Sequence, residues 1–131
     1  MKEDLVRLLL VDENAAVRRA LVLRLSRAQD IQIIGATGSF EAAMTTLVEQ
    51  HPDVLILESK RRDGGALKFC RQVLEMTLPP RIVILTSFPS EDERLSFAHL
   101  GINQYLLKDI DTEELIRVVR REAQQIRLRS T

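Results

Sequence analysis

Short apolar runs alternate with longer segments of helical spacing along the chain. The runs are rich in Val, Ile and Leu, and they predict five β-strands at residues 8–11, 31–34, 54–57, 82–85 and 105–107. The first, third and fourth runs are continuously apolar, which is typical of parallel strands with both faces buried.

Between the strands, apolar residues recur three or four positions apart, as they do on one face of an amphipathic helix. We therefore expect a helix after each strand. The five stripes consist of Val17, Leu21, Leu25 and Ala28; Ala43, Met44 and Leu47; Leu67, Val73 and Leu74; Leu95, Ala98 and Leu100; and Leu115, Val118, Val119, Ala123 and Ile126.

Polar residues and one glycine predict where the helices begin and end. Asn14 and Ser39 are expected N-caps, whose side-chain oxygens accept hydrogen bonds from the free N–H groups of the first turn. Ser90–Glu93 and Asp111–Glu114 have the spacing of a capping box, in which two residues exchange side-chain-to-backbone hydrogen bonds. Gly101 is expected to end the fourth helix, because glycine readily adopts the left-handed conformation common there.

Five strand–helix units with short connections predict an α/β fold. The expected architecture is a doubly wound parallel sheet with helices on both faces and right-handed crossovers. A chain of 131 residues has the length of one domain, so we expect residues 1–131 to form a single domain. The basic end of the chain, with five Arg and one Glu between Arg117 and Thr131, is either a solvated helix terminus or the start of a linker.

The composition excludes several classes of function. The 19 Lys and Arg residues balance 19 Asp and Glu residues, so no strong net field attracts nucleic acid or acidic membranes. With no Trp, one Tyr and four Phe, a base-stacking platform for single-stranded nucleic acid is not expected. The single cysteine excludes an internal disulfide and fits a reducing compartment, and no apolar run approaches the roughly 20 residues that span a bilayer. We expect a cytoplasmic protein that does not contact a membrane.

The residues that follow the strands carry the candidate chemistry. Asp12 and Glu13 follow the first strand, Glu58 ends the third, Thr86 ends the fourth and Lys108 follows the fifth. In an open parallel sheet these carboxyl ends meet along one edge, where ligands bind. Carboxylates held so close together must share a proton, recruit a cation or pair with the lysine. Oxygen ligands of this kind suit Mg²⁺.

Four segments carry a resemblance to a known family. They are LLLVDEN (8–14), HPDVLILE (51–58), RIVILTSF (81–88) and GINQYLLKD (101–109). With them the chain resembles the receiver domain of two-component response regulators, in particular the LuxR-type subfamily, from about residue 7 to 121. The resemblance implies a flavodoxin-like (βα)5 fold with strand order 2-1-3-4-5, and it leaves residues 122–131 as a helix end or the start of a linker.

The resemblance also implies a metal site and a phosphorylation site. In receivers the acids after the first strand hold a divalent metal, which gives Asp12 and Glu13 this role. The backbone carbonyl two residues beyond the acceptor is a further metal ligand and corresponds to Lys60. Mg²⁺ is thus the implied cofactor.

The phosphoacceptor aspartate of the family corresponds to Glu58 in this chain. The resemblance implies that Thr86 and Lys108 contact the phosphoryl oxygens and that Tyr105 is the aromatic residue that changes rotamer on activation.

Two departures from the family pattern change the expected mechanism. Glu58 is one methylene longer than aspartate, whereas phosphoryl transfer depends on an in-line nucleophile. The loop SKRRDGG (59–65) is shorter than in most receivers and lacks their proline, which puts the Lys60 carbonyl ligand in doubt. Lys60, Arg61 or Arg62 would then lend a positive charge to the acidic cluster in place of Mg²⁺, unless all three are simply solvated.

The favoured function is an atypical receiver that signals without phosphorylation, as an interaction module. One alternative is a phosphorylation-switched receiver that takes its phosphoryl group from a histidine kinase and is at most a weak enzyme, acting on itself. Another is a small-ligand-binding domain of the same topology. Expected partners are a histidine kinase or other signalling protein, and a second copy through the fourth helix, fifth strand and fifth helix or through the first and fifth helices. DNA would be reached only through an output domain outside this chain.

Overall fold

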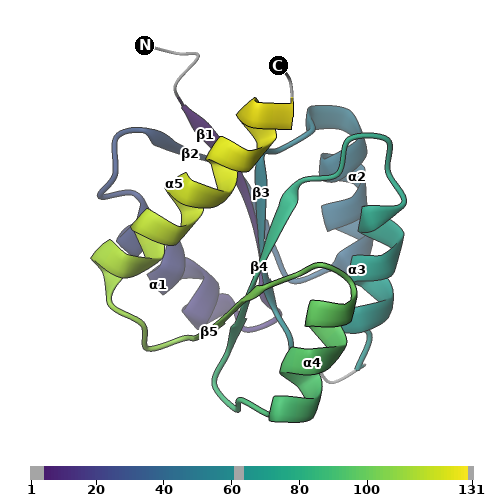
Figure 1. The fold of residues 1–131 in the computed structure, drawn as a ribbon. Coiled ribbons are helices and arrows are strands. Elements are labelled where there is room, and N and C mark those ends of the chain that lie inside the picture. The colour runs from purple at the N-terminus through teal and green to yellow at the C-terminus, as the bar shows by residue number, and fades with distance from the viewer. Residues whose placement is uncertain (1–4, 61–63, 130–131) are drawn as a thin grey trace.

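A computed structural model describes residues 5–60 and 64–129 of the chain. Its sheet has five parallel strands in the order β2-β1-β3-β4-β5, which confirms the predicted α/β fold and strand order (Figure 1). The strands are β1 (Val6–Val11), β2 (Ile31–Thr37), β3 (Val54–Glu58), β4 (Arg81–Thr86) and β5 (Gln104–Leu107). The helices are α1 (Ala15–Leu25), α2 (Phe40–Gln50), α3 (Ala66–Leu74), α4 (Glu91–His99) and α5 (Thr112–Arg129).

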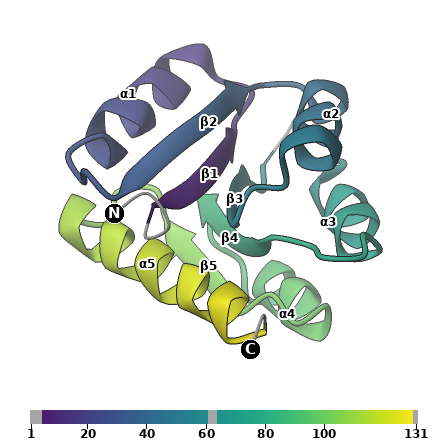
Figure 2. The ribbon, with the colours of Figure 1, turned by 90° about the horizontal axis from the view of Figure 1, so that it is seen from above.

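Helices cover both faces of the sheet. Figure 2 shows α1 and α5 on one face and α2, α3 and α4 on the other. Alternate residues of β1 supply the two cores: Leu8 and Leu10 pack with α1 and α5, whereas Leu9 and Val11 pack with α2 and α3. All four of these side chains are fully buried, which explains why residues 8–11 of this strand are continuously apolar.

The predicted N-caps Asn14 and Ser39 are confirmed. Asn14 Oδ1 accepts a hydrogen bond from the Val17 N–H at 3.0 Å, and Ser39 Oγ accepts one from the Ala42 N–H at 3.1 Å. Both caps hold the start of a helix close to the carboxyl end of the preceding strand. Gly101 follows α4 with φ +86°, so its expected left-handed conformation is also confirmed.

The capping box predicted for Ser90 and Glu93 forms only in part. Ser90 Oγ accepts from the Glu93 N–H at 3.1 Å, but the Ser90 N–H donates to Tyr105 Oη at 3.2 Å and not to the Glu93 carboxylate. That carboxylate is drawn to donors from other elements, as described below. For the second predicted box, Leu115 N–H donates to the Asp111 carbonyl at 2.9 Å, and its side-chain contacts stay a prediction.

The prediction of which residues form the buried face of α4 was partly wrong. Leu95 is 42% exposed, whereas Phe97, which the stripe left out, is 2% exposed and belongs to the core beside α3. Residues two positions apart in a helix point in directions about 200° apart, so Leu95 and Phe97 lie on opposite faces. The larger ring takes the buried place in this short helix. In the described part of the chain, no helix has the length and apolar character needed to cross a membrane.

Candidate functional site

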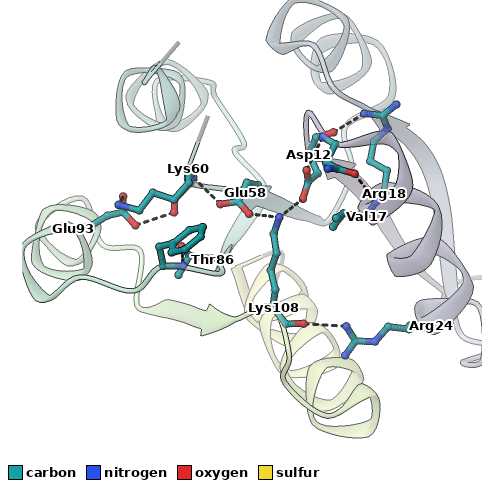
Figure 3. A network of polar contacts seen from close by, with 12 residues as sticks. Asp12, Val17, Arg18, Arg24, Glu58, Lys60, Thr86, Glu93 and Lys108 are labelled. Atoms are coloured by element: carbon teal, nitrogen blue, oxygen red, sulfur yellow. Dashed lines mark hydrogen bonds and ion pairs between the residues drawn. The ribbon is translucent and has the colours of Figure 1, made fainter. Parts of the chain in front are cut away.

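Four side chains predicted to share a site meet at the carboxyl edge of the sheet. Asp12 follows β1, Glu58 ends β3, Thr86 ends β4 and Lys108 follows β5 (Figure 3). Asp12, Glu58 and Thr86 are 1%, 4% and 0% exposed, which is unusual for polar residues and requires partners within the protein.

Lys108 provides the positive charge for both buried carboxylates. Its Nζ lies 2.7 Å from Asp12 Oδ2 and forms a second ion pair with Glu58 Oε2. Burial by itself would lower the pKa of the Lys108 amine, but hydrogen bonds and attraction from Asp12 and Glu58 outweigh burial, so the pKa is raised. The side chain is therefore an ammonium, and it lies between the two acids in Figure 3.

Backbone N–H groups bind the other oxygen of each carboxylate. Asp12 Oδ1 accepts from the Asn14 N–H at 2.9 Å, and Glu58 Oε1 accepts from the Lys60 N–H at 2.6 Å. Both oxygens of Glu58 thus have partners. Asp12 Oδ2 is buried and, among the described residues, receives no hydrogen bond, so the Lys108 ion pair is the contact that compensates its charge.

Two arginines of α1 hold the backbone that carries this ion pair. Arg18 Nη1 donates to the Asp12 carbonyl at 2.6 Å, and Arg24 Nη1 donates to the Lys108 carbonyl at 3.2 Å. Arg24 also donates to Thr112 Oγ1 at 2.8 Å and to the Ile110 carbonyl. The segment between β5 and α5 is thereby fixed against α1, and with it the position of Lys108.

Thr86 lies beside the ion pairs at the end of β4. Its Oγ1 accepts from the Phe88 N–H at 3.1 Å, and its carbonyl accepts from the Lys108 N–H at 2.9 Å. An open pocket of about 310 Å³ adjoins it, lined by Thr86, Ser87, Leu107, Lys108 and Asp109. Lys108, whose side chain is 18% exposed, can be reached from solvent through this pocket, whereas Thr86 is fully buried.

Glu93 is a polar centre that the sequence did not assign to the site. Its Oε1 accepts from Tyr105 Oη at 2.6 Å and from Ser59 Oγ at 2.8 Å, and its Oε2 lies 3.1 Å from Lys60 Nζ. Burial by itself would raise the pKa of the Glu93 carboxyl, but the contacts with Tyr105, Ser59 and Lys60 outweigh burial and lower it. The spacing of Ser90 and Glu93 predicted the start of a helix. The partners of the Glu93 side chain lie 12 to 34 residues away in the chain, so the sequence around Glu93 could not predict them.

The expected metal ligands do not converge around an open position. Glu13 is exposed beside Asp12, and in residues 5–60 and 64–129 no three His, Cys, Asp or Glu side chains gather in a way that could hold a metal ion. The Lys108 ammonium already lies between Asp12 and Glu58. A divalent ion bound by both acids would have to displace it from this position.

The suggestion that the side chain of Lys60 neutralises the acidic cluster was wrong. Its ammonium pairs with Glu93, and only its backbone N–H contacts Glu58. The positive charge that contacts Asp12 and Glu58 comes from Lys108, whose long side chain reaches both acids from the end of β5. Arg61 and Arg62 lie outside the described residues.

Comparison with known proteins assigns the family. The profile of the response regulator receiver domain matches residues 8–120. The chain belongs to this family. It is 34% identical over 116 residues to the DNA-binding transcriptional activator DevR/DosR of Mycobacterium tuberculosis, over 88% of this chain and 54% of that protein. It is 28% identical to the transcriptional regulatory protein LiaR of Bacillus subtilis, over 88% of this chain and 55% of that protein. The chain therefore spans about half of the length of these relatives.

Solved structures of the family confirm the fold. A DNA-binding response regulator of the LuxR family from Staphylococcus aureus superposes with a TM-score of 0.82 at 22% identity, covering 91% of this chain and 99% of that one. A LuxR-family two-component response regulator from Aurantimonas sp. gives a TM-score of 0.84 at 20% identity, covering 92% and 86%. The chain thus shares its fold with these two structures.

Proposed function

We propose that this receiver domain signals as an interaction module whose active arrangement does not depend on phosphorylation. The observation that carries the proposal is the engagement of Glu58 through both oxygens, by the Lys60 N–H and the Lys108 ammonium. The longer side chain extends into the pocket and holds Lys108 there. In a receiver that uses aspartate, the resemblance assigns the corresponding lysine to the phosphoryl oxygens.

The same contacts oppose transfer of a phosphoryl group to Glu58. An efficient nucleophile must lie in line with the donor, with its lone pair free, and a displacement of about 1 Å can lower a rate about 10²-fold. Either oxygen of Glu58 already contacts a backbone N–H or an ammonium, and such a contact lowers its nucleophilicity. Attack by Glu58 would also require a carboxylate one methylene longer than aspartate to reach the in-line position.

Lys108 takes the place of a divalent cation in this proposal. A cation between Asp12 and Glu58 offsets the repulsion of two buried carboxylates, and an ammonium supplies that charge from within the chain. The side chain of Lys108 is held by the two acids, and its backbone is held by Arg24. The proposed domain therefore works without Mg²⁺.

The proposed partners are proteins. They are a histidine kinase or another signalling protein, and a second copy of the chain through α4, β5 and α5 or through α1 and α5. DevR/DosR is named as a DNA-binding transcriptional activator, and this chain aligns with 54% of it. We propose that contact with DNA is made by an output domain and not by the receiver fold described here.

Intact mass after incubation with acetyl phosphate and Mg²⁺ tests the proposal. The wild-type chain is expected to gain no stoichiometric phosphoryl adduct. Glu58→Asp restores the family's acceptor and is expected to gain one, which acts as the positive control because every other site residue is unchanged. An adduct on Glu58 of the wild type would refute the proposal. An inert Glu58→Asp variant would instead place the block in loop 59–65.

A second candidate is a phosphorylation-switched receiver that uses Mg²⁺, and one observation favours it. Asp12 Oδ2 is buried and, apart from its ion pair with Lys108, has no hydrogen-bond partner in the described structure, as expected of an oxygen that could bind a metal. If this candidate holds, millimolar Mg²⁺ raises the melting temperature of the wild type. An unchanged melting temperature argues for the ammonium-filled pocket.

A further inference from the structure

One carboxylate joins three elements that are far apart in the chain. Glu93, in the first turn of α4, contacts Ser59 and Lys60 after β3 and Tyr105 in β5. The side chain of Glu93 is 21% exposed, so these contacts are only partly screened by water. A carboxylate so placed orders three neighbours at once, which an exposed surface pair does not.

The contacts continue from the Glu58 pocket to the surface of α4 and β5. Lys60 donates its backbone N–H to Glu58 Oε1 and directs its ammonium to Glu93 Oε2. Glu93 Oε1 in turn accepts a hydrogen bond from the phenol of Tyr105, whose oxygen accepts one from the Ser90 N–H. The succession Glu58, Lys60 and Glu93 is visible in Figure 3.

We propose that Glu93 is a positioning residue that fixes the ring of Tyr105 and couples it, through Lys60, to the Glu58 pocket. The contact does not require a group bound in the pocket, so Tyr105 has one fixed position in the resting protein. This inference rests on the contacts of Glu93 and stands whether or not Glu58 accepts a phosphoryl group.

Tyrosine spectroscopy reads this position without interference from other residues. Tyr105 is the single tyrosine of a chain that contains no tryptophan, so its emission and its phenolate absorbance belong to one side chain. A carboxylate that accepts a hydrogen bond from the phenol lowers the intensity of tyrosine fluorescence emission. Burial raises the pKa of Tyr105, and the hydrogen bond to Glu93 raises it further.

The first test compares Glu93→Gln with Asp92→Asn. Both remove one negative charge from the first turn of α4, but only the first removes the carboxylate that contacts Tyr105. Glu93→Gln is expected to increase Tyr105 emission at neutral pH and to move the phenolate transition to lower pH. Asp92→Asn is expected to leave both unchanged. Equal behaviour of the two variants would overturn the assignment.

The second test asks whether Lys60 is coupled to Tyr105. In the described part of the chain Lys60 reaches Tyr105 through Glu93, so Lys60→Met is expected to change the emission of Tyr105 in a folded protein. In a double-mutant cycle, Lys60→Met and Tyr105→Phe are expected to have non-additive effects on the urea midpoint, and the non-additivity should vanish in the Glu93→Gln background.

These outcomes decide the proposal. The coupling would be overturned if Lys60→Met and Tyr105→Phe had additive effects in the wild-type background, or if Lys60→Met left the emission of Tyr105 unchanged. If Glu93→Gln does not fold, the Lys60→Met emission and the cycle in the wild-type background still decide it. The intact-mass test of Glu58 is independent, so either proposal can fail without the other.

Discussion

Lys108 and Asp12 form an ion pair between the segments that follow the last and the first strand of the chain, with Nζ 2.7 Å from Oδ2. Asp12 follows β1 and Lys108 follows β5, and the sheet order places β3 and β4 between these two strands. The lysine therefore reaches past the end of β4 to contact both Glu58 and Asp12. One of the two negative charges of Asp12 and Glu58 is thereby offset from within the chain.

Removing the ammonium should destabilise the domain and create a need for a cation. Lys108→Met leaves two carboxylates buried without their partner, and breaking such a pair costs about 3–5 kcal/mol. Urea denaturation is expected to show this loss, and millimolar Mg²⁺ should restore part of it in the variant while leaving the wild type unchanged. Lys68→Met, at an exposed position of α3, is the control. A stability equal to that of the wild type would show that the ion pairs contribute nothing.

Arg24 should stabilise the fold more than another arginine of the same helix. Arg24→Ala removes hydrogen bonds to Thr112, Lys108 and Ile110, and lost hydrogen bonds of a charged group cost about 1.5–3 kcal/mol. Arg19→Ala changes an exposed residue of α1 and should stay within about 0.5 kcal/mol of the wild type. Urea midpoints of the two variants check the difference, and equal values would contradict a holding role for Arg24.

The contacts of Glu93 should weaken in acid. The pKa of its carboxyl is lowered below the ordinary 4.5, so its stabilising contribution is fully present above about pH 4.5 and is lost as the pH falls through the lowered value. Tyr105 emission should therefore rise with acidification in the wild type before unfolding, and stability should fall more steeply in the wild type than in Glu93→Gln. Parallel stability curves for the two proteins, measured by urea denaturation across this range, would contradict the contribution.

Local patterns predicted the fold and the edge where the site lies. The apolar run ending at Val11 and the N-cap at Asn14 bracket Asp12, so its place at a strand end follows from neighbouring residues. The same reasoning placed Glu58, Thr86 and Lys108 on one edge. These predictions hold because strand ends and caps are set within a few residues of the chain.

Contacts between elements were beyond such reasoning. The partners of Glu93 depend on how α4 packs against the segment after β3, and a helix-start signal says nothing of that packing. Lys60 was one of three residues considered as a positive charge for the acidic cluster, but its ammonium pairs with Glu93, and side-chain direction decides between the two. Phe97 took the buried place expected for Leu95 because nine helical residues contain too few apolar positions to define a face.

The position of the cation in the pocket tests the central claim most directly. Crystals of the wild type grown with millimolar Mn²⁺, an anomalous scatterer that binds at Mg²⁺ sites, would reveal any metal between Asp12 and Glu58. We expect no anomalous peak there, with Lys108 Nζ in contact with both carboxylates. A peak bound by Asp12 and Glu58, with the Lys108 side chain displaced, would contradict the account.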